Sequence, residues 1–392
     1  MIIPNIFRYI KLPEDVADKD KIKKYEMTLR LAYEYPAKLL EPIFHFPIHY
    51  KILRFISKID ELTKTKNYKN IQISNENIGN VCCRVYQKKE QSENAILYIH
   101  GGGFVALKPR FFDQTCVELA ESTNSIIFSI DYSLSPEAPI YCALDECCNV
   151  IESLYENDYK KFNFNKNKII IFGESAGGNI GAALSLRLIR RQKKHYFYKK
   201  ILVNPIVSYI NFFSPSHQIY SNNYDGSSLL SPRFKTLMLM YYTNINLTND
   251  EICKIMKNCH VSKEIRLLPY LSINNLPNEW VAKNNNNNND NSLDDEIDIK
   301  LVEKMKDIVT NPEISPILGD NNDLSQLPST MIITCGIDIL RDEGYLYKKR
   351  LEIIGVNVTW KHYNNTIHGI ISMFDFEMRK TVMNSIFEFI EN

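Results

Sequence analysis

Residues 168–183 read KIIIFGESAGGNIGAA, and this stretch decides the fold class. A short apolar run typical of a buried strand leads into the turn Gly173–Gly177, and small and apolar residues typical of a helix follow it. Such a turn holds its serine in strained backbone geometry, and side chains at Gly173 or Gly177 would clash with neighbouring backbone. The N-terminus of the following helix favours an anion beside Ser175. The stretch therefore predicts a nucleophilic serine at position 175.

The pattern around this stretch predicts a sheet. From residue 79 onward, short β-branched runs alternate with segments typical of helices. The predicted strands are Val81–Val85, Ala95–Ile99, Ile126–Ile130, Ile169–Phe172, Ile201–Ile206, Met331–Thr334 and Val356–Trp360. Because these runs are continuously apolar, both faces of the sheet must be covered. We therefore expect an α/β fold with a parallel, doubly wound sheet.

A second motif, His100-Gly101-Gly102-Gly103, directly follows one of the predicted strands. Consecutive glycines cost backbone entropy on folding, and a flexible turn is the plain explanation for them. The functional explanation is that bare backbone lets N–H groups converge on one point, as an oxyanion hole requires. We expect Gly101 and Gly102 to supply two donors and Ala176 to supply a third, with His100 and Gly103 supporting the motif.

A serine nucleophile needs a base within hydrogen-bond reach, and the base needs an acid that orients it. Two histidines compete for the role of base. We favour His368, in a loop beyond the last predicted strand, over His362, which falls within or at the end of that strand. We favour Asp338 as the acid over Asp342, whose place in a first helical turn is explained by the helix dipole. The predicted catalytic residues are Ser175, Asp338 and His368.

Composition excludes several other classes of protein. The 392 residues include Lys+Arg 47 and Asp+Glu 46, so the formal net charge is +1, which argues against nucleic-acid binding. No phosphate-binding glycine pattern precedes a helix, and the remaining histidines lack the spacing of metal ligands, so we expect neither cofactor nor metal. The 9 cysteines are irregularly spaced, which favours reduced thiols in a cytoplasmic protein.

Two regions lie outside the strand pattern. We expect residues 1–75 to form an N-terminal arm and residues 76–392 to form the catalytic domain. Within the arm, the apolar stretch 36–55 is interpreted as packing over the core, with a lipophilic substrate entrance or a shallow membrane contact as the alternative. Residues 211–310 interrupt the strand pattern and are expected to form a lid, in which the run Asn284–Asn289 is a disordered surface loop.

The motifs together resemble one family. They are HGGG at 100–103, DYSLSPE at 131–137, GESAGGN at 173–179, NPEISPIL at 311–318, IITCGIDILRDEG at 332–344 and HG at 368–369. In this order they resemble the hormone-sensitive-lipase branch of the α/β-hydrolases and, within it, the arylacetamide deacetylase-like carboxylesterases. The resemblance implies an eight-stranded, mostly parallel sheet with a lid. One departure is Ser133, where the family motif DYRLAPE has an arginine.

The resemblance also implies a function. Such relatives are serine carboxylesterases, and some cleave aryl amides or neutral lipid esters, so we expect hydrolysis of a small-molecule, apolar ester through an acyl-enzyme. The alternative is a non-catalytic small-molecule receptor on the same fold, in which the histidine or the glycine motif is typically altered. Because relatives of this type usually carry a membrane anchor, association with the endoplasmic reticulum is the alternative to a cytoplasmic location. The physiological substrate and the oligomeric state stay open.

Overall fold

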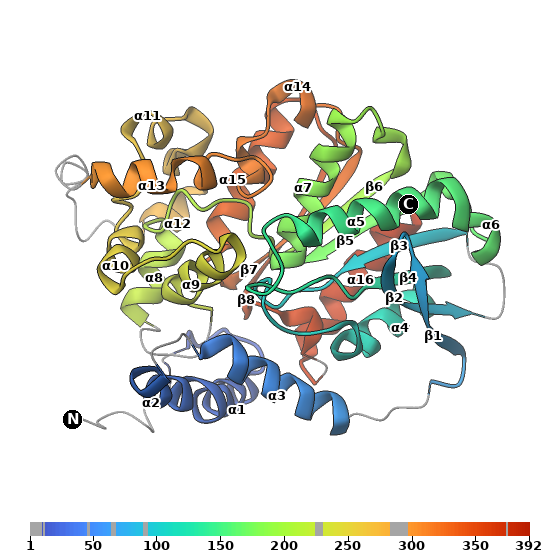
Figure 1. Cartoon of the computed structure of the whole chain (residues 1–392), viewed down its shortest axis with the longest axis horizontal. Coiled ribbons are helices and arrows are strands. Elements are labelled where there is room, and N and C mark those ends of the chain that lie inside the picture. Colours follow the sequence, from blue (N-terminus) through green and yellow to red (C-terminus); the bar gives the residue numbers. More distant parts are fainter. Residues whose placement is uncertain are drawn as a thin grey trace.

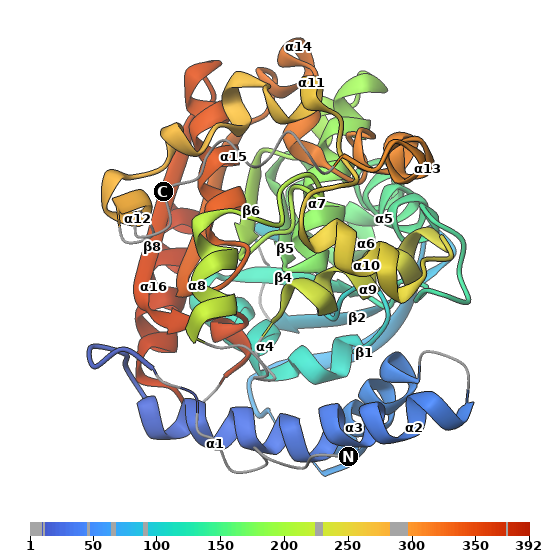
Figure 2. The ribbon, with the colours of Figure 1, turned by 90° about the vertical axis from the view of Figure 1, so that its left-hand side faces the viewer.

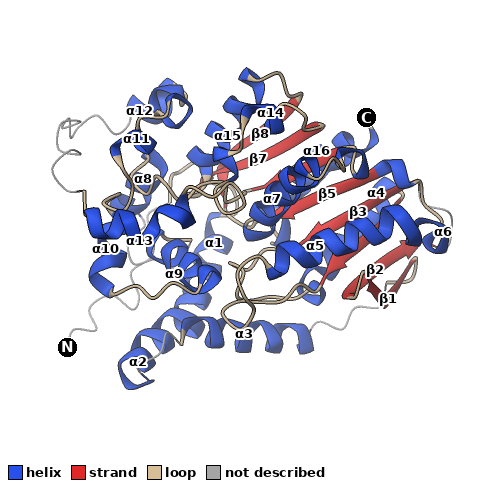
Figure 3. Cartoon of the chain, turned by 45° about the horizontal axis from the view of Figure 1, so that its top comes forward, coloured by secondary structure: helices blue, strands red, loops and turns tan. Residues whose placement is uncertain are grey.

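One sheet runs through the molecule, with strands in the order β1-β2-β4-β3-β5-β6-β7-β8 (Figure 3). The computed structural model describes residues 10, 12–44, 48–63, 68–88, 93–223, 230–282, 297–373 and 375–392. The strands are β1 Ile71–Ile78, β2 Val81–Lys88, β3 Asn94–Ile99, β4 Ser125–Ile130, β5 Ile169–Glu174, β6 Lys199–Val203, β7 Ser329–Ile337 and β8 Val358–Ile367. The eight strands confirm the predicted α/β-hydrolase architecture.

The sheet is mostly parallel, but its first part is not. β2 pairs antiparallel with both β1 and β4, so the expectation of parallel pairing for the run that begins at Val81 is wrong. The strand β1 was not predicted, because its sequence IQISNENI is largely polar and only its two end residues are buried. It also begins at Ile71, ahead of the predicted boundary at residue 76. β6 stops at Val203, short of the predicted end, because Asn204 adopts a positive φ of 46° and turns the chain.

Helices cover both faces of the sheet, as predicted. On one face lie α4 Asp113–Thr123 and α16 Glu377–Glu391, and on the other lie α5 Cys142–Ser153, α7 Ala176–Arg190 and α15 Arg341–Ile353. Strand β3 shows why both faces are covered. Ile96 and Tyr98 lie in the core beneath α4 and α16, whereas Leu97 and Ile99 lie in the core beneath α5, α7 and α15, and all four are fully buried. A strand buried on both sides needs apolar residues at every position.

The N-terminal arm forms a layer of helices along one side of the molecule (Figures 1 and 2). It consists of α1 Lys19–Leu29, a π-helical turn over residues 30–34, α2 Tyr35–Phe44 and α3 His49–Thr63. Ile22 of α1 is fully buried in the main core. Leu39 and Phe55, by contrast, are 72% and 65% exposed. The shallow membrane contact of this arm stays a prediction. None of the helices in the described ranges is both long and apolar enough to cross a bilayer.

In the chain between β6 and β7, where the strand pattern stops, the predicted lid is helical (Figure 1). Its longer helices are α8 Pro215–Asn223, α9 Pro232–Thr243, α10 Asn249–Met256 and α13 Ile299–Val309, and its shorter ones are α11 Lys263–Arg266 and α12 Asn278–Ala282. The described parts of residues 211–310 contain no strand. The predicted disordered loop at Asn284–Asn289 lies outside the described residues.

Candidate active site

Ser175 occupies the sharp turn between β5 and α7. Its φ and ψ are 55° and −117°, a conformation that residues with a side chain rarely adopt and that clusters at functional sites. The turn is possible because the backbone crowds together at its glycines. A Cβ at Gly173 would lie 2.2 Å from the carbonyl oxygen of Gly177, and a Cβ at Gly177 would lie 2.0 Å from that of Ile99. The Ser175 N–H donates to Val203 O at 2.9 Å, which fixes the turn to the sheet.

The predicted base and acid lie in line with this serine. His368 Nε2 is 2.9 Å from Ser175 Oγ, and His368 Nδ1 is 2.9 Å from Asp338 Oδ2. A carboxylate only accepts, so Nδ1 carries the proton and Nε2 is the acceptor for the serine hydroxyl. Asp338 is itself fixed by Asn204 Nδ2 at 2.8 Å and by the Leu340 N–H at 2.9 Å. The Asp338 side chain is fully buried, whereas that of His368 is 19% exposed.

The two competing residues are engaged elsewhere. His362 lies within β8, and its Nδ1 is 2.9 Å from Thr334 Oγ1. Burial lowers its pKa to about 4, so its imidazole is neutral. Asp342 stands in the first turn of α15, where it accepts from Arg341 Nε at 2.7 Å and from the Ser216 N–H at 2.7 Å. The structure brings neither side chain into hydrogen-bond contact with Ser175.

The predicted oxyanion donors adjoin the serine. A Cβ at Gly101 would lie 3.3 Å from Ser175 Cβ, so this backbone passes directly beside the serine. Gly102 has a φ of +118°, and a Cβ there would lie 2.1 Å from Ala106 O. None of the hydrogen bonds found among the described residues uses the N–H of Gly101 or Gly102. Ala176 is the first residue of α7, where a helix leaves its N–H without an intrahelical partner.

His100 supports this loop from below. Its Nδ1 lies 2.7 Å from the Gly101 carbonyl oxygen, and its ring stacks on Tyr132 at 4.3 Å between centroids. Burial lowers the pKa of His100 to about 4, so the imidazole is neutral and donates through Nδ1. Gly103 has a φ of +63°, and a Cβ there would lie 2.7 Å from Met238 Sδ of the lid. His100 and Gly103 thus shape the loop without facing the serine.

The charge of the base is tuned by its surroundings. Burial by itself lowers the pKa of His368, but the adjacent charge of Asp338, the hydrogen bond to it and the charge of Glu174 outweigh burial. The net effect is a pKa above the ordinary value of 6.5. An imidazole with a raised pKa is a better proton acceptor, which suits His368 to the predicted role of base.

Glu174 is a site residue that sequence reasoning missed. This carboxylate precedes the serine, is 2% exposed and accepts from Ser372 Oγ at 3.2 Å, with Tyr98 OH at 3.4 Å. Burial raises its pKa to about 7, against the lowering effects of His368 and these hydroxyls. A signal was available, because a carboxylate between a buried strand and a buried helix has no route to solvent.

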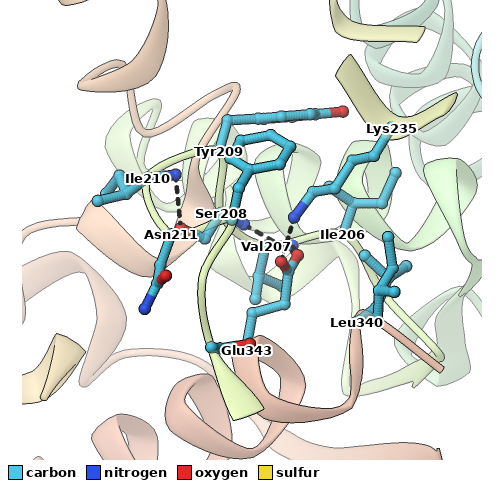
Figure 4. A network of polar contacts seen from close by, with 12 residues as sticks. Ile206, Val207, Ser208, Tyr209, Ile210, Asn211, Lys235, Leu340 and Glu343 are labelled. Atoms are coloured by element: carbon cyan, nitrogen blue, oxygen red, sulfur yellow. Dashed lines mark hydrogen bonds and ion pairs between the residues drawn. The ribbon is translucent and has the colours of Figure 1, made fainter. Parts of the chain in front are cut away.

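A buried ion pair joins α9 to α15 (Figure 4). Lys235 of α9 contacts Glu343 of α15, and their side chains are 0% and 7% exposed. Glu343 Oε1 also accepts from the N–H groups of Val207 at 2.9 Å and Ser208 at 3.3 Å, while Lys235 Nζ lies 5.4 Å from the ring centre of Tyr209. Because a buried charge that loses its partner is strongly destabilising, this pair holds α9 in place.

Across the described ranges, no group of three or more His, Cys, Asp or Glu side chains converges as a metal site requires. What the described side chains do bring together is a hydroxyl, an imidazole and a carboxylate in hydrogen-bonded order beside unpaired backbone donors. That set can remove a proton from a hydroxyl and stabilise a negative oxygen next to it.

Comparison with known proteins identifies the family. Residues 96–281 and 255–372 match the sequence profile of the alpha/beta hydrolase fold. The chain belongs to the α/β-hydrolase fold family. Its curated relatives include arylacetamide deacetylase-like 3 of Mus musculus, 23% identical with 92% of this chain and 90% of that protein aligned. Another is neutral cholesterol ester hydrolase 1 of Bos taurus, 26% identical over 92% of this chain and 88% of that protein. These relatives confirm the predicted resemblance.

Solved structures of esterases share the fold of this hydrolase. A thermostable carboxylesterase cloned from a metagenomic library superposes with a TM-score of 0.64 at 19% identity, covering 87% of this chain and 96% of that one. The esterase of Pyrobaculum calidifontis gives a TM-score of 0.61 at 22% identity, covering 90% and 96%. At these identities the likeness supports the fold and leaves the chemistry to the geometry of the site.

Proposed function

We propose that this α/β-hydrolase is a serine hydrolase that cleaves carboxylic esters through an acyl-enzyme intermediate. The observation that carries the proposal is the unbroken chain from Ser175 Oγ through His368 to Asp338, with 2.9 Å at each link. In a receptor that had lost its chemistry, nothing would maintain this geometry together with a strained serine. The strain costs about 1–3 kcal/mol and is retained where it has a use.

The proposed reaction has two steps. His368 Nε2 takes the Ser175 proton as Oγ attacks the ester carbonyl carbon, and the negative oxygen is bound by the N–H groups of Gly101, Gly102 and Ala176. The imidazolium then gives its proton to the departing alcohol, which leaves an ester between Ser175 and the acyl group. Water repeats the sequence with His368 as base, which releases the acid and restores the serine hydroxyl.

We propose an apolar ester as the substrate. The relative named neutral cholesterol ester hydrolase 1 supports this choice. A profile of hydrolysis across p-nitrophenyl esters of increasing acyl length measures the preference directly.

The proposal is tested with the full chain and one hydroxyl. Ser175→Ala should abolish hydrolysis of p-nitrophenyl butyrate and labelling by a fluorophosphonate, because Ser175 Oγ carries the acyl group in this mechanism. Ser153→Ala is the matched control, since this serine ends α5 and its hydroxyl donates to Asp158. Equal labelling of the wild type and Ser175→Ala would refute the assignment. A wild-type protein that binds apolar esters without turnover would support the receptor alternative.

A further inference from the structure

The glycine loop beside Ser175 is strained well beyond its glycines. We define the oxyanion loop as residues 101–107, which follow β3. Besides Gly102 and Gly103, two residues with side chains, Phe104 and Leu107, have positive φ values of 68° and 69°. Such conformations cost free energy and persist only where surrounding structure imposes them. The loop must therefore be held by contacts from outside itself.

Three separate parts of the chain supply these contacts. The lid contributes α9, whose Tyr242 stacks on Phe104 and whose Met238 packs against Gly103. The segment after β4 contributes the N–H of Ser135, which donates to the Phe104 carbonyl oxygen at 2.9 Å. The third part is the N-terminal arm, in which one side chain of α3 hydrogen-bonds to the loop.

That side chain is Arg54, and its guanidinium bonds both to the oxyanion loop and to the segment after β4. Nε donates to Val105 O at 2.6 Å, and Nη2 donates to Ser135 O at 2.8 Å. The two Nη atoms also bind the Glu137 carboxylate, at 2.9 and 2.8 Å, and the group lies 4.9 Å from the ring centre of Tyr50. A planar fork of donors fixes directions that a lysine ammonium cannot fix.

The ion pair itself is not what matters here. Glu137 is 58% exposed and Arg54 is 29% exposed, and ion pairs in water contribute little to stability. The bond to Val105 O differs, because the N–H groups of Val105 and Ala106 close a turn onto Gly102 O at 3.2 and 3.1 Å. Holding the Val105 carbonyl therefore holds the turn that sets the direction of the Gly102 N–H.

We infer that Arg54 is a positioning residue for the oxyanion hole, so that the N-terminal arm is part of the catalytic machinery and not only a cover. The inference rests on the proposed esterase function. The family motif DYRLAPE has an arginine at position 133, where this chain has Ser133. Ser133 is instead bonded through its N–H and Oγ to Glu146, at 2.6 and 2.5 Å.

The test compares Arg54→Ala, Arg54→Lys and the control Arg190→Ala in hydrolysis of p-nitrophenyl butyrate. Arg190 pairs with Asp323 at the end of α7 away from the serine, so its loss should leave activity unchanged. For Arg54→Ala we expect kcat to fall about 10- to 100-fold, as for misplaced catalytic groups, with KM within about twofold. Arg54→Lys should recover little, whereas added guanidinium ion should restore part of the activity of Arg54→Ala.

A transition-state analogue separates positioning from general loosening. A trifluoromethyl ketone forms an adduct with Ser175 Oγ, and the serine proton passes to His368. The former ketone oxygen of the adduct is negative and lies where the oxyanion of the reaction forms. The affinity for the ketone should fall by the same factor as kcat/KM in Arg54→Ala, while fluorescence-detected thermal unfolding reports whether the chain still folds. Glu137→Gln leaves the hydrogen bonds from Arg54 to the backbone in place, so its kcat/KM and its affinity for the ketone should fall less than those of Arg54→Ala.

The outcomes are distinguishable. An active wild type with unchanged kcat and ketone affinity in Arg54→Ala would overturn the inference and leave the esterase intact. A rise in KM alone would also overturn it, because the arm would then only shape the substrate site. An inactive wild type that is not labelled by a fluorophosphonate would instead refute the proposed function.

Discussion

The two strained elements of the site are held in opposite ways. The nucleophile turn, Gly173–Gly177, is fixed from within: β5 and α7 are its own flanks, its backbone packs against β3, and the surrounding residues are buried. The oxyanion loop, residues 101–107, is fixed from outside by Arg54 of the arm, by Ser135 and by the lid helix α9. The position of the serine therefore depends on the sheet and its flanking helix, whereas the position of the oxyanion donors depends also on contacts from the N-terminal arm and the lid.

This difference predicts how substitutions in the two elements affect folding and activity. A change in the turn should damage folding and activity together, because the turn cannot move without the core moving. A change in the loop should damage activity far more than folding. Three substitutions test this contrast, from the largest expected effect to the smallest.

The largest effect is expected for Gly177→Ala. The added Cβ would lie 2.0 Å from Ile99 O, and only movement of β3 or α7 can relieve such a contact. Overpacking of a core costs about 1–3 kcal/mol, and we expect a loss at or above the upper end. The urea midpoint of unfolding should fall markedly and activity should be lost. Retention of the wild-type midpoint would show that the turn is as adaptable as the loop.

A large but different effect is expected for Gly102→Ala. Its Cβ would meet Ala106 O at 2.1 Å, and its φ of +118° is unfavourable for alanine, so the loop should adopt another conformation. Loss of one oxyanion donor costs about 100- to 1000-fold in kcat. The urea midpoint should change little compared with Gly177→Ala. Equal losses of stability in the two variants would remove the contrast between turn and loop.

The smallest effect is expected for Glu174→Gln, which leaves both elements in place. His368 acts in its neutral form, so kcat/KM falls as pH drops through its pKa, which Glu174 helps to raise. Removing the charge should move this acid limb to lower pH, with a loss of less than about tenfold at the optimum. The measurement is kcat/KM between about pH 5 and 9 in both proteins.

The stability of Glu174→Gln should follow from the same burial. Folding raises the pKa of Glu174 from its ordinary value of 4.5 to about 7. The free energy of unfolding therefore decreases as the pH rises from 4.5 to about 7, because the unfolded chain loses this proton first. Glutamine removes this decrease, so above pH 7 the variant should be at least as stable as the wild type. Glu152→Gln, which removes a surface carboxylate paired with Lys193, is the control for charge. An acid limb that moves equally in both variants would argue against a local effect.

Much of the fold and the placement of the site residues could be predicted from the sequence. Buried parallel strands are continuously apolar, so β3, β4, β5 and β7 were found near their observed bounds. Ser175, Asp338 and His368 follow strand ends in the order that the motifs suggested, and the structure brings them into contact. Local pattern was sufficient here because each residue is positioned by its own strand.

The remaining features depend on contacts that no local pattern records. β1 has a polar sequence because it is an edge strand that faces solvent along much of its length. Arg54 is one of several basic residues on an amphipathic helix, and only tertiary packing shows that it reaches Val105 O. Lys235 lies in an ordinary helix, and its burial follows from a partner 108 residues away in the sequence.

The buried position of Lys235 also bears on how this enzyme could be redesigned. Swinging α9 away from α15 would separate a fully buried ammonium from its carboxylate, so the helix acts as a rigid wall. Redesign of the substrate preference should therefore keep Lys235 and Glu343, because α9 also holds the oxyanion loop through Met238 and Tyr242.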